Sequence, residues 1–112
     1  MNISIAEHAI RIVIISLEGR LDVFSVPYLR ERINTLMGEG VIKFVLDLTQ
    51  ISFLDSAGMA VLVTILKRTR ELGGDVRLVW PQEEAARQIL RLTKFDRAFT
   101  IMDCVEEAVR HF

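Results

Sequence analysis

The feature that most constrains this chain is a pair of strongly apolar runs in its first half. Residues 10–17 and 41–48 are almost continuously apolar and are rich in β-branched side chains. Runs of this length and composition are typical of strands buried on both faces, as in a parallel sheet. Because parallel strands need long crossover connections, which are usually helices, the runs predict an α/β fold.

The remaining strands are shorter and are bounded by turn residues or by a change to helical spacing. A tight turn at His8-Ala9 is expected to join the first two strands, and residues 49–54 are expected to form a loop. Gly19 is expected to end the second strand. The expected strands are residues 3–7, 10–17, 41–48, 76–79 and 99–102.

Apolar residues at helical spacing recur between these strands, with capping residues before them and glycines after them. Ser25 is expected to act as an N-cap, with Pro27 in the first helical turn. The expected helices run from Ser25 to a stop at Gly38 and Gly40, from Asp55-Ser56 to Gly73-Gly74, from Pro81 to Thr93, and onward from a capping-box-like start at Asp103 and Glu106.

The resulting order is β-β-α-β-α-β-α-β-α, a hairpin followed by three βαβ units. Right-handed crossovers then give a mixed, mostly parallel β-sheet of 4–5 strands, with about four helices packed on it. The first strand is expected at an antiparallel edge. The 112 residues fit one domain.

Charge and composition argue against several classes of function. The net charge is −1, from 14 basic and 15 acidic residues with no basic run, which disfavours nucleic-acid binding. No stretch approaches 18 apolar residues, and the first residues lack the pattern of a signal peptide, so no membrane span and a cytoplasmic location are expected. Cys104, the sole cysteine, cannot form an internal disulfide.

Candidate functional residues lie at the carboxyl ends of the two long strands, where open α/β sheets place their sites. One junction is residues 18–22 and the other is residues 53–59. If the two strands are neighbours, these loops lie side by side.

The second junction contains Asp55-Ser56-Ala57-Gly58 at a predicted helix start. Either Asp55 or Ser56 can cap the helix, and only one is needed. If Asp55 is the cap, the Ser56 hydroxyl is left free and faces solvent. Gly58 costs the helix about 1 kcal/mol relative to Ala, which indicates that another backbone approaches closely there. A helix cap without any further role explains the same residues.

Several segments, in this order along the chain, resemble the STAS domain, specifically that of bacterial anti-sigma factor antagonists. The resemblance covers residues 3–110. The segments are Gly19-Arg20-Leu21-Asp22, Val45-Leu46-Asp47-Leu48, Ile51-Ser52-Phe53-Leu54-Asp55-Ser56-Ala57-Gly58-Met59, Leu72-Gly73-Gly74 and Leu90-Arg91-Leu92-Thr93-Lys94-Phe95-Asp96.

This resemblance implies a protein-binding module switched by phosphorylation. In that family, an anti-sigma factor that is also an ATP-dependent serine kinase phosphorylates the serine after the motif aspartate, here Ser56. The unphosphorylated antagonist binds this partner and releases a sigma factor, and a PP2C-type phosphatase removes the phosphate. The implied partner-binding residues are Asp22, Asp55, Ser56, Ala57, Gly58 and Met59.

Many relatives carry Ser or Thr at the position of Ala57. In this chain Ser56 is the only residue with a hydroxyl group in the motif of residues 55–59. Two other classes of function are open. A phosphoacceptor receiver enzyme could use Asp47, but Arg20 stands where an acidic pair would be required. The chain holds no convergent set of nucleophile and base, so no enzyme, cofactor or metal is expected. A STAS-like scaffold or ligand-sensing module of a transporter or signalling assembly would keep the fold without the switch.

Overall fold

The computed structural model describes residues 1–8 and 11–112. Ten elements follow the predicted order, with one extra short helix. The strands are β1 (Asn2–His8), β2 (Ile12–Leu21), β3 (Lys43–Leu54), β4 (Asp75–Val79) and β5 (Thr100–Met102). The helices are α1 (Val26–Gly38), α2 (Ser56–Glu71), α3 (Glu84–Leu92), α4 (Phe95–Ala98) and α5 (Val105–Arg110).

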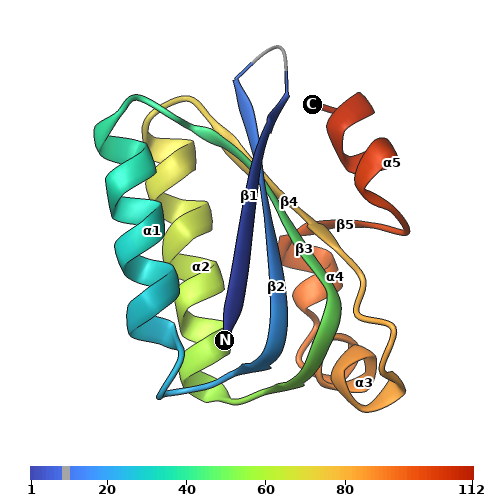
Figure 1. Ribbon diagram of the computed structural model, residues 1–112. Coiled ribbons are helices and arrows are strands. Elements are labelled where there is room, and N and C mark those ends of the chain that lie inside the picture. Colours follow the sequence, from blue (N-terminus) through green and yellow to red (C-terminus); the bar gives the residue numbers. More distant parts are fainter. Residues whose placement is uncertain (9–10) are drawn as a thin grey trace.

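The strands form one sheet in the order β1-β2-β3-β4-β5, with β1 antiparallel to β2 and the other pairs parallel. The predicted mixed, mostly parallel sheet with an antiparallel edge is therefore confirmed. Helices α1 and α2 lie side by side on one face, and α5 lies on the other side of the sheet (Figure 1). This arrangement explains why the two long runs are apolar throughout, since both faces of β2 and β3 need cover.

Alternate residues of β3 enter two different apolar clusters. Phe44 and Leu46 pack into the larger cluster with α1 and α2, whereas Val45 packs with Ala108 of α5. None of the helices in residues 1–8 and 11–112 is long and apolar enough to cross a membrane.

The two long strands continue further than expected, and the predicted loop at residues 49–54 is wrong. Gly19 does not end β2. It has a φ of +105°, and the register shifts before and after it. These irregularities allow β2 and β3 to remain paired as far as Leu21 and Leu54. Ile51 and Leu54 are buried, so the second half of β3 contributes to the core.

Two predicted helix starts are also wrong, and one helix was not predicted. Helix α3 begins at Glu84 and not at Pro81, because the backbone there is held elsewhere: the Gln82 N–H donates to the Thr49 carbonyl at 3.3 Å. The one-turn helix α4 was not expected. At α5 the N-cap position is Cys104, and no side chain caps the helix, so the capping box at Asp103 is absent.

The first hairpin is described only in part. β1 extends to His8, whose backbone is paired with Ile12 of β2. Ala9 and Ile10 lie outside the described residues, so the tight turn at His8-Ala9 and the start of the strand at residue 10 stay predictions.

Candidate functional site

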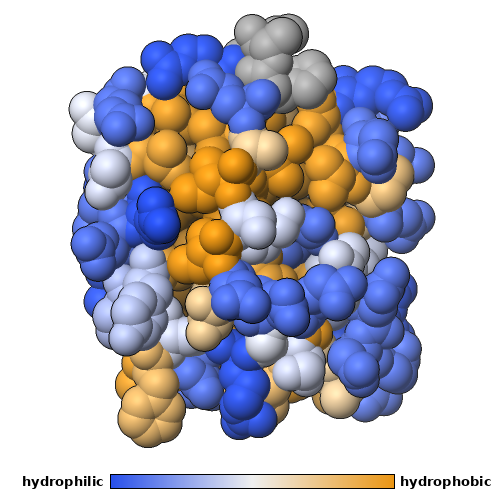
Figure 2. All heavy atoms as spheres, in the orientation of Figure 1, coloured by the Kyte–Doolittle hydropathy of each residue, from blue (hydrophilic) through white to orange (hydrophobic). Residues whose placement is uncertain are grey.

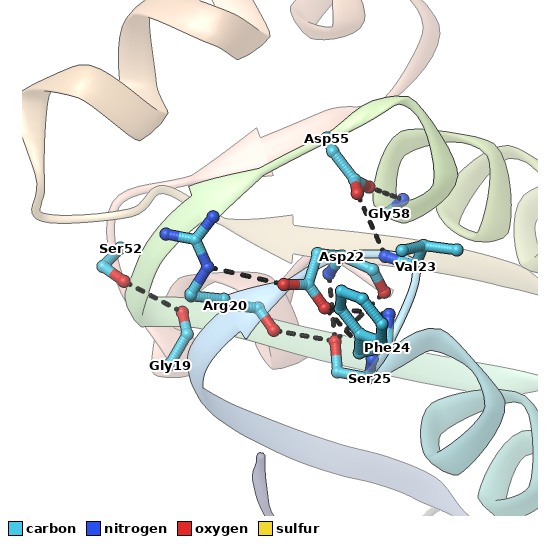
Figure 3. A network of polar contacts seen from close by, with 9 residues as sticks. All are labelled: Gly19, Arg20, Asp22, Val23, Phe24, Ser25, Ser52, Asp55 and Gly58. Atoms are coloured by element: carbon cyan, nitrogen blue, oxygen red, sulfur yellow. Dashed lines mark hydrogen bonds and ion pairs between the residues drawn. The ribbon is translucent and has the colours of Figure 1, made fainter.

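The two candidate loops meet where β2 and β3 end. Leu21 and Leu54 are partners in the parallel register. One residue later, the Asp55 N–H donates to the Leu21 carbonyl at 3.3 Å. The expectation that the loops lie side by side is therefore confirmed (Figure 3).

Asp55 is the N-cap of α2, which decides between the two predicted caps. One carboxylate oxygen, Oδ1, accepts from the Gly58 N–H at 2.8 Å. The other, Oδ2, accepts from the Val23 N–H at 3.0 Å, across 32 positions of sequence. One half-buried side chain thus caps the helix and ties the β2–α1 turn to it.

Ser56 is the first residue of α2 and is exposed. Because Asp55 takes the capping role, the Ser56 hydroxyl is free of that duty. Among residues 1–8 and 11–112, no side chain or backbone group forms a hydrogen bond with this hydroxyl. The first-turn N–H groups of a helix have no partner within the helix, so the local potential around this hydroxyl suits an anion.

The rest of the predicted motif lies behind or beside Ser56. Gly58 is buried, and a Cβ atom added there would stand 2.1 Å from the Leu21 carbonyl oxygen. The expected close approach of another backbone is confirmed. Ala57 and Met59 are half-buried and pack against the larger core cluster. Within this motif, therefore, Ser56 has the most accessible side chain, and Gly58 allows the helix to pack closely against the Leu21 backbone.

Asp22 lies at the other loop and is engaged by its own turn. Oδ1 accepts from the N–H groups of Phe24 and Ser25, at 3.0 and 3.1 Å, and Oδ2 accepts from Arg20 Nε at 3.4 Å. Desolvation raises the pKa of this carboxyl, but the bonds from Ser25 and Phe24, together with Arg20, outweigh that effect and leave the pKa below its ordinary value.

Ser25 occupies the N-cap position of α1, as predicted, but its side chain makes no capping hydrogen bond to the helix. Its hydroxyl instead donates to the Arg20 carbonyl at 2.7 Å and accepts from the Asp22 N–H at 3.0 Å. The Asp22 carbonyl accepts from the Val26 N–H at 2.9 Å, which begins the helix. Asp22 and Ser25 thus close one compact turn between β2 and α1.

Two residues at this site were not singled out from the sequence: Val23 and Phe24 are exposed apolar side chains in the turn. Beside them, the Arg20 guanidinium lies 4.0 Å from the centroid of the Phe53 ring. The only sequence signal of Val23 and Phe24 is an apolar pair between two turn-forming polar residues, Asp22 and Ser25. In residues 1–8 and 11–112, no group of three or more His, Cys, Asp or Glu side chains is placed to hold a metal ion.

Comparison with known proteins identifies a matching family and similar proteins. The family described as "STAS domain" matches residues 4–108. A Thermotoga neapolitana protein named as a candidate anti-sigma factor antagonist is 34% identical over 76 residues, which are 68% of this chain and 66% of that protein. The match therefore spans just under two thirds of that relative's length.

Solved structures show the same architecture. The crystal structure of a candidate anti-sigma factor antagonist from Thermotoga maritima has a TM-score of 0.89 and 26% identity, and the match covers 97% of this chain and 92% of that one. The Bacillus protein SpoIIAA has been solved in an unphosphorylated form (TM-score 0.78, 23% identity, 98% and 96% coverage) and in a phosphorylated form (0.75, 21%, 98% and 98%), and it shares the fold.

A family match over most of the chain and a relative at 34% identity point the same way. The mixed sheet agrees with the architecture of the similar solved structures. The chain therefore belongs to the STAS domain family, and relatives that it matches carry the name anti-sigma factor antagonist.

Proposed function

We propose that residues 1–112 act as one phosphorylation-switched binding domain and that Ser56 is the acceptor of the phosphate. When Ser56 is unphosphorylated, the domain binds an anti-sigma factor that is also an ATP-dependent serine kinase, and a sigma factor is released. A PP2C-type phosphatase restores the binding form. In this scheme the chain is cytoplasmic. Enzymes bind it and modify it, and it is not an enzyme itself.

The observation that carries the proposal is that Asp55, and not its neighbour Ser56, caps α2. Asp55 caps α2, so the exposed Ser56 hydroxyl has no structural duty that a phosphate would disrupt. A kinase can therefore reach this oxygen in the folded domain. The names of the relatives support the partner, and the phosphorylated form of SpoIIAA supports the modification.

A phosphate on Ser56 would act mainly on the partner and little on the fold. It would add about −1.5 to −2 units of charge beside the first-turn N–H groups, where anions are tolerated. The half-buried carboxylates of Asp55 and Asp22 lie on the same side of the domain. A partner packed over this spot would have to bury the added charge, which costs several kcal/mol, or roughly 10³-fold in affinity.

The experiment uses the full chain and each purified anti-sigma factor with a serine kinase domain from the same genome. The chain is incubated with each one and Mg-ATP, and phosphate is mapped by mass spectrometry. Affinities of wild type, Ser56→Asp and Ser56→Ala are measured by titration calorimetry without ATP. We expect phosphate on Ser56 alone, a loss of roughly 10³-fold for Ser56→Asp and unchanged affinity for Ser56→Ala.

Two outcomes would overturn the proposal. A chain that every such kinase leaves unmodified would be a non-switching scaffold module. Equal affinities for wild type and Ser56→Asp would show that charge at Ser56 does not control binding. Thermal unfolding of both variants provides the control, because Ser56 makes no capping bond and neither change should lower Tm appreciably.

A further inference from the structure

The turn between β2 and α1 and the first turn of α1 expose three large apolar or aromatic side chains. Phe24 is 82% exposed, Tyr28 is 64% exposed and Val23 is 57% exposed. Phe24 and Tyr28 line the same shallow hollow of about 420 Å³, together with Arg20 and Asp22 at its polar side. An apolar cluster is visible where the chain enters α1, at the lower left of Figure 2. Clusters of this kind on a folded domain mark interaction sites.

This apolar cluster adjoins the proposed phosphorylation site. The Val23 N–H donates to Asp55 Oδ2, and Asp55 immediately precedes Ser56 in the chain. A partner that covers Ser56 must therefore also meet the turn that carries Val23 and Phe24. The same hydrogen bond is drawn between the two loops in Figure 3.

The turn is also held rigidly. The Phe24 N–H donates to Asp22 Oδ1 at 3.0 Å, and the Val23 N–H is held by Asp55. Successive backbone groups of the turn are thus fixed by two different carboxylates. Ordering a loop on binding costs free energy, so a side chain presented by a fixed loop contributes more of its burial to affinity.

The motif around Ser56 is too small to form an interface alone. A specific interface buries about 800 Å² on each partner and has an apolar centre. Gly58 is buried, and Ala57 and Met59 are half-buried, so they offer little of that area. Aromatic side chains are the commonest anchors of such interfaces, and Phe24 is the most exposed large apolar side chain among the described residues.

We propose that Phe24, supported by Val23 and Tyr28, is the apolar anchor that inserts into a pocket on the anti-sigma partner. This inference rests on the proposed function and names the part of the surface that supplies its affinity. The anchor and the switch are then separate: Phe24 holds the unphosphorylated domain on its partner, and a phosphate on Ser56 places charge beside that contact.

The test measures the affinity of Phe24→Ala and Phe24→Leu for the anti-sigma factor that binds wild type in the experiment above. Loss of an anchoring side chain lowers affinity by about 30-fold or more, and we expect this for Phe24→Ala, with a smaller loss for Phe24→Leu. The matched control is Leu72→Ala. Leu72 is 58% exposed and follows the last residue of α2, at the opposite end of the helix from Ser56. We expect less than about a threefold change for this control.

The outcomes separate the two proposals. If Ser56→Asp loses affinity and Phe24→Ala does not, the switch stands and the anchor is wrong. If both Phe24→Ala and Leu72→Ala lose affinity equally, the effect is not specific to this turn, and the anchor is also wrong. If wild type binds no anti-sigma factor, both proposals fall. Because Phe24 is almost fully exposed, Phe24→Ala should keep the Tm of wild type, which checks that the variant folds.

Discussion

The two ends of α2 obey the same steric constraint but offer different chemistry. At its start, a Cβ atom on Gly58 would stand 2.1 Å from the Leu21 carbonyl oxygen. Just beyond its end, a Cβ atom on Gly74 would stand 1.8 Å from the Ile42 carbonyl oxygen. Both ends are therefore pressed against the backbone at the ends of strands, which fixes the helix on the sheet.

What differs is the hydroxyl at each end. Ser56 is exposed and does not cap the helix, whereas Thr69 is buried and donates to the Ile65 and Leu66 carbonyls. The C-terminal end is closed by the Gly74 N–H, which donates to the Thr69 carbonyl at 2.8 Å. Close packing around a glycine is thus a structural signal that both ends share. The exposed hydroxyl is what distinguishes the candidate site.

The largest expected effect is the loss of stability caused by alanine at either glycine. Gly58→Ala and Gly74→Ala should each lower the free energy of unfolding by about 3 kcal/mol, because the added methyl overlaps a backbone carbonyl. Urea unfolding measures this loss as a shift in the midpoint of the unfolding transition, with the slope of the free energy against urea concentration unchanged. A more stable Gly58→Ala variant, as helix propensity alone would give, would contradict the close approach. Only Gly58→Ala should also displace the turn at Val23 and weaken partner binding.

Removing the cap should have the next largest effect. Asp55→Ala should cost about 1–2 kcal/mol, since the variant loses the bond to Gly58 and the bond to Val23. The matched control is Asp103→Ala at the start of α5, where the sequence suggests a cap but no side chain forms one. That change should stay within about 0.5 kcal/mol. Equal losses in the two variants would mean that Asp55 does not bridge the loops.

The two hydroxyls should respond differently to deletion. Thr69→Ala should destabilise the domain by about 1 kcal/mol because it empties buried space in the core. Ser56→Ala should change stability by less than about 0.5 kcal/mol. Thermal unfolding compares the two. A Ser56→Ala variant that melts as far below wild type as Thr69→Ala would show that the Ser56 hydroxyl stabilises the fold. That result would count against Ser56 as a phosphate acceptor with no structural role.

The smallest effect is the acid response of two carboxyls, one near each end of α2. The pKa values of Asp22 and Asp75 both lie below the ordinary value. Desolvation raises both, but bonds from the Ser25 and Phe24 N–H groups lower the first, and chiefly the hydrogen bond from Arg77 lowers the second. The stability that each contributes is present above the unfolded-state pKa of about 3.9 and is lost as pH falls through the lower folded-state value.

NMR titration of the two carboxyls at low and high salt would separate them. The charge of Arg77 also contributes at Asp75, so we expect the Asp75 pKa to rise toward normal in high salt, because salt screens charge pairs. The Asp22 pKa should move less, since backbone N–H groups make its largest favourable contributions. Equal salt responses would contradict this difference between the two ends.

Much of the fold follows from local pattern. The apolar β-branched runs predict two central parallel strands, and the glycines predict where α1 and α2 stop. The boundaries that failed are those where distant partners compete with local signals. Residues 49–54 are polar enough to suggest a loop, but pairing with β2 around the irregularity at Gly19 keeps them in β3. Similarly, a bond to Thr49 keeps the segment after Pro81 out of α3.

By itself the sequence determined the class of fold, the helix start at Asp55-Ser56 and the need for a close backbone contact at Gly58, because each depends on residue type at short range. Only the tertiary structure decided that Asp55, besides capping the helix, ties the β2–α1 turn to it, since its second oxygen accepts from Val23 in a segment 32 positions away. Tertiary structure also decided that Phe24 is exposed while its apolar neighbours in sequence, Leu21 and Val26, are buried. Exposure depends on which surfaces distant elements cover, and no local pattern encodes that.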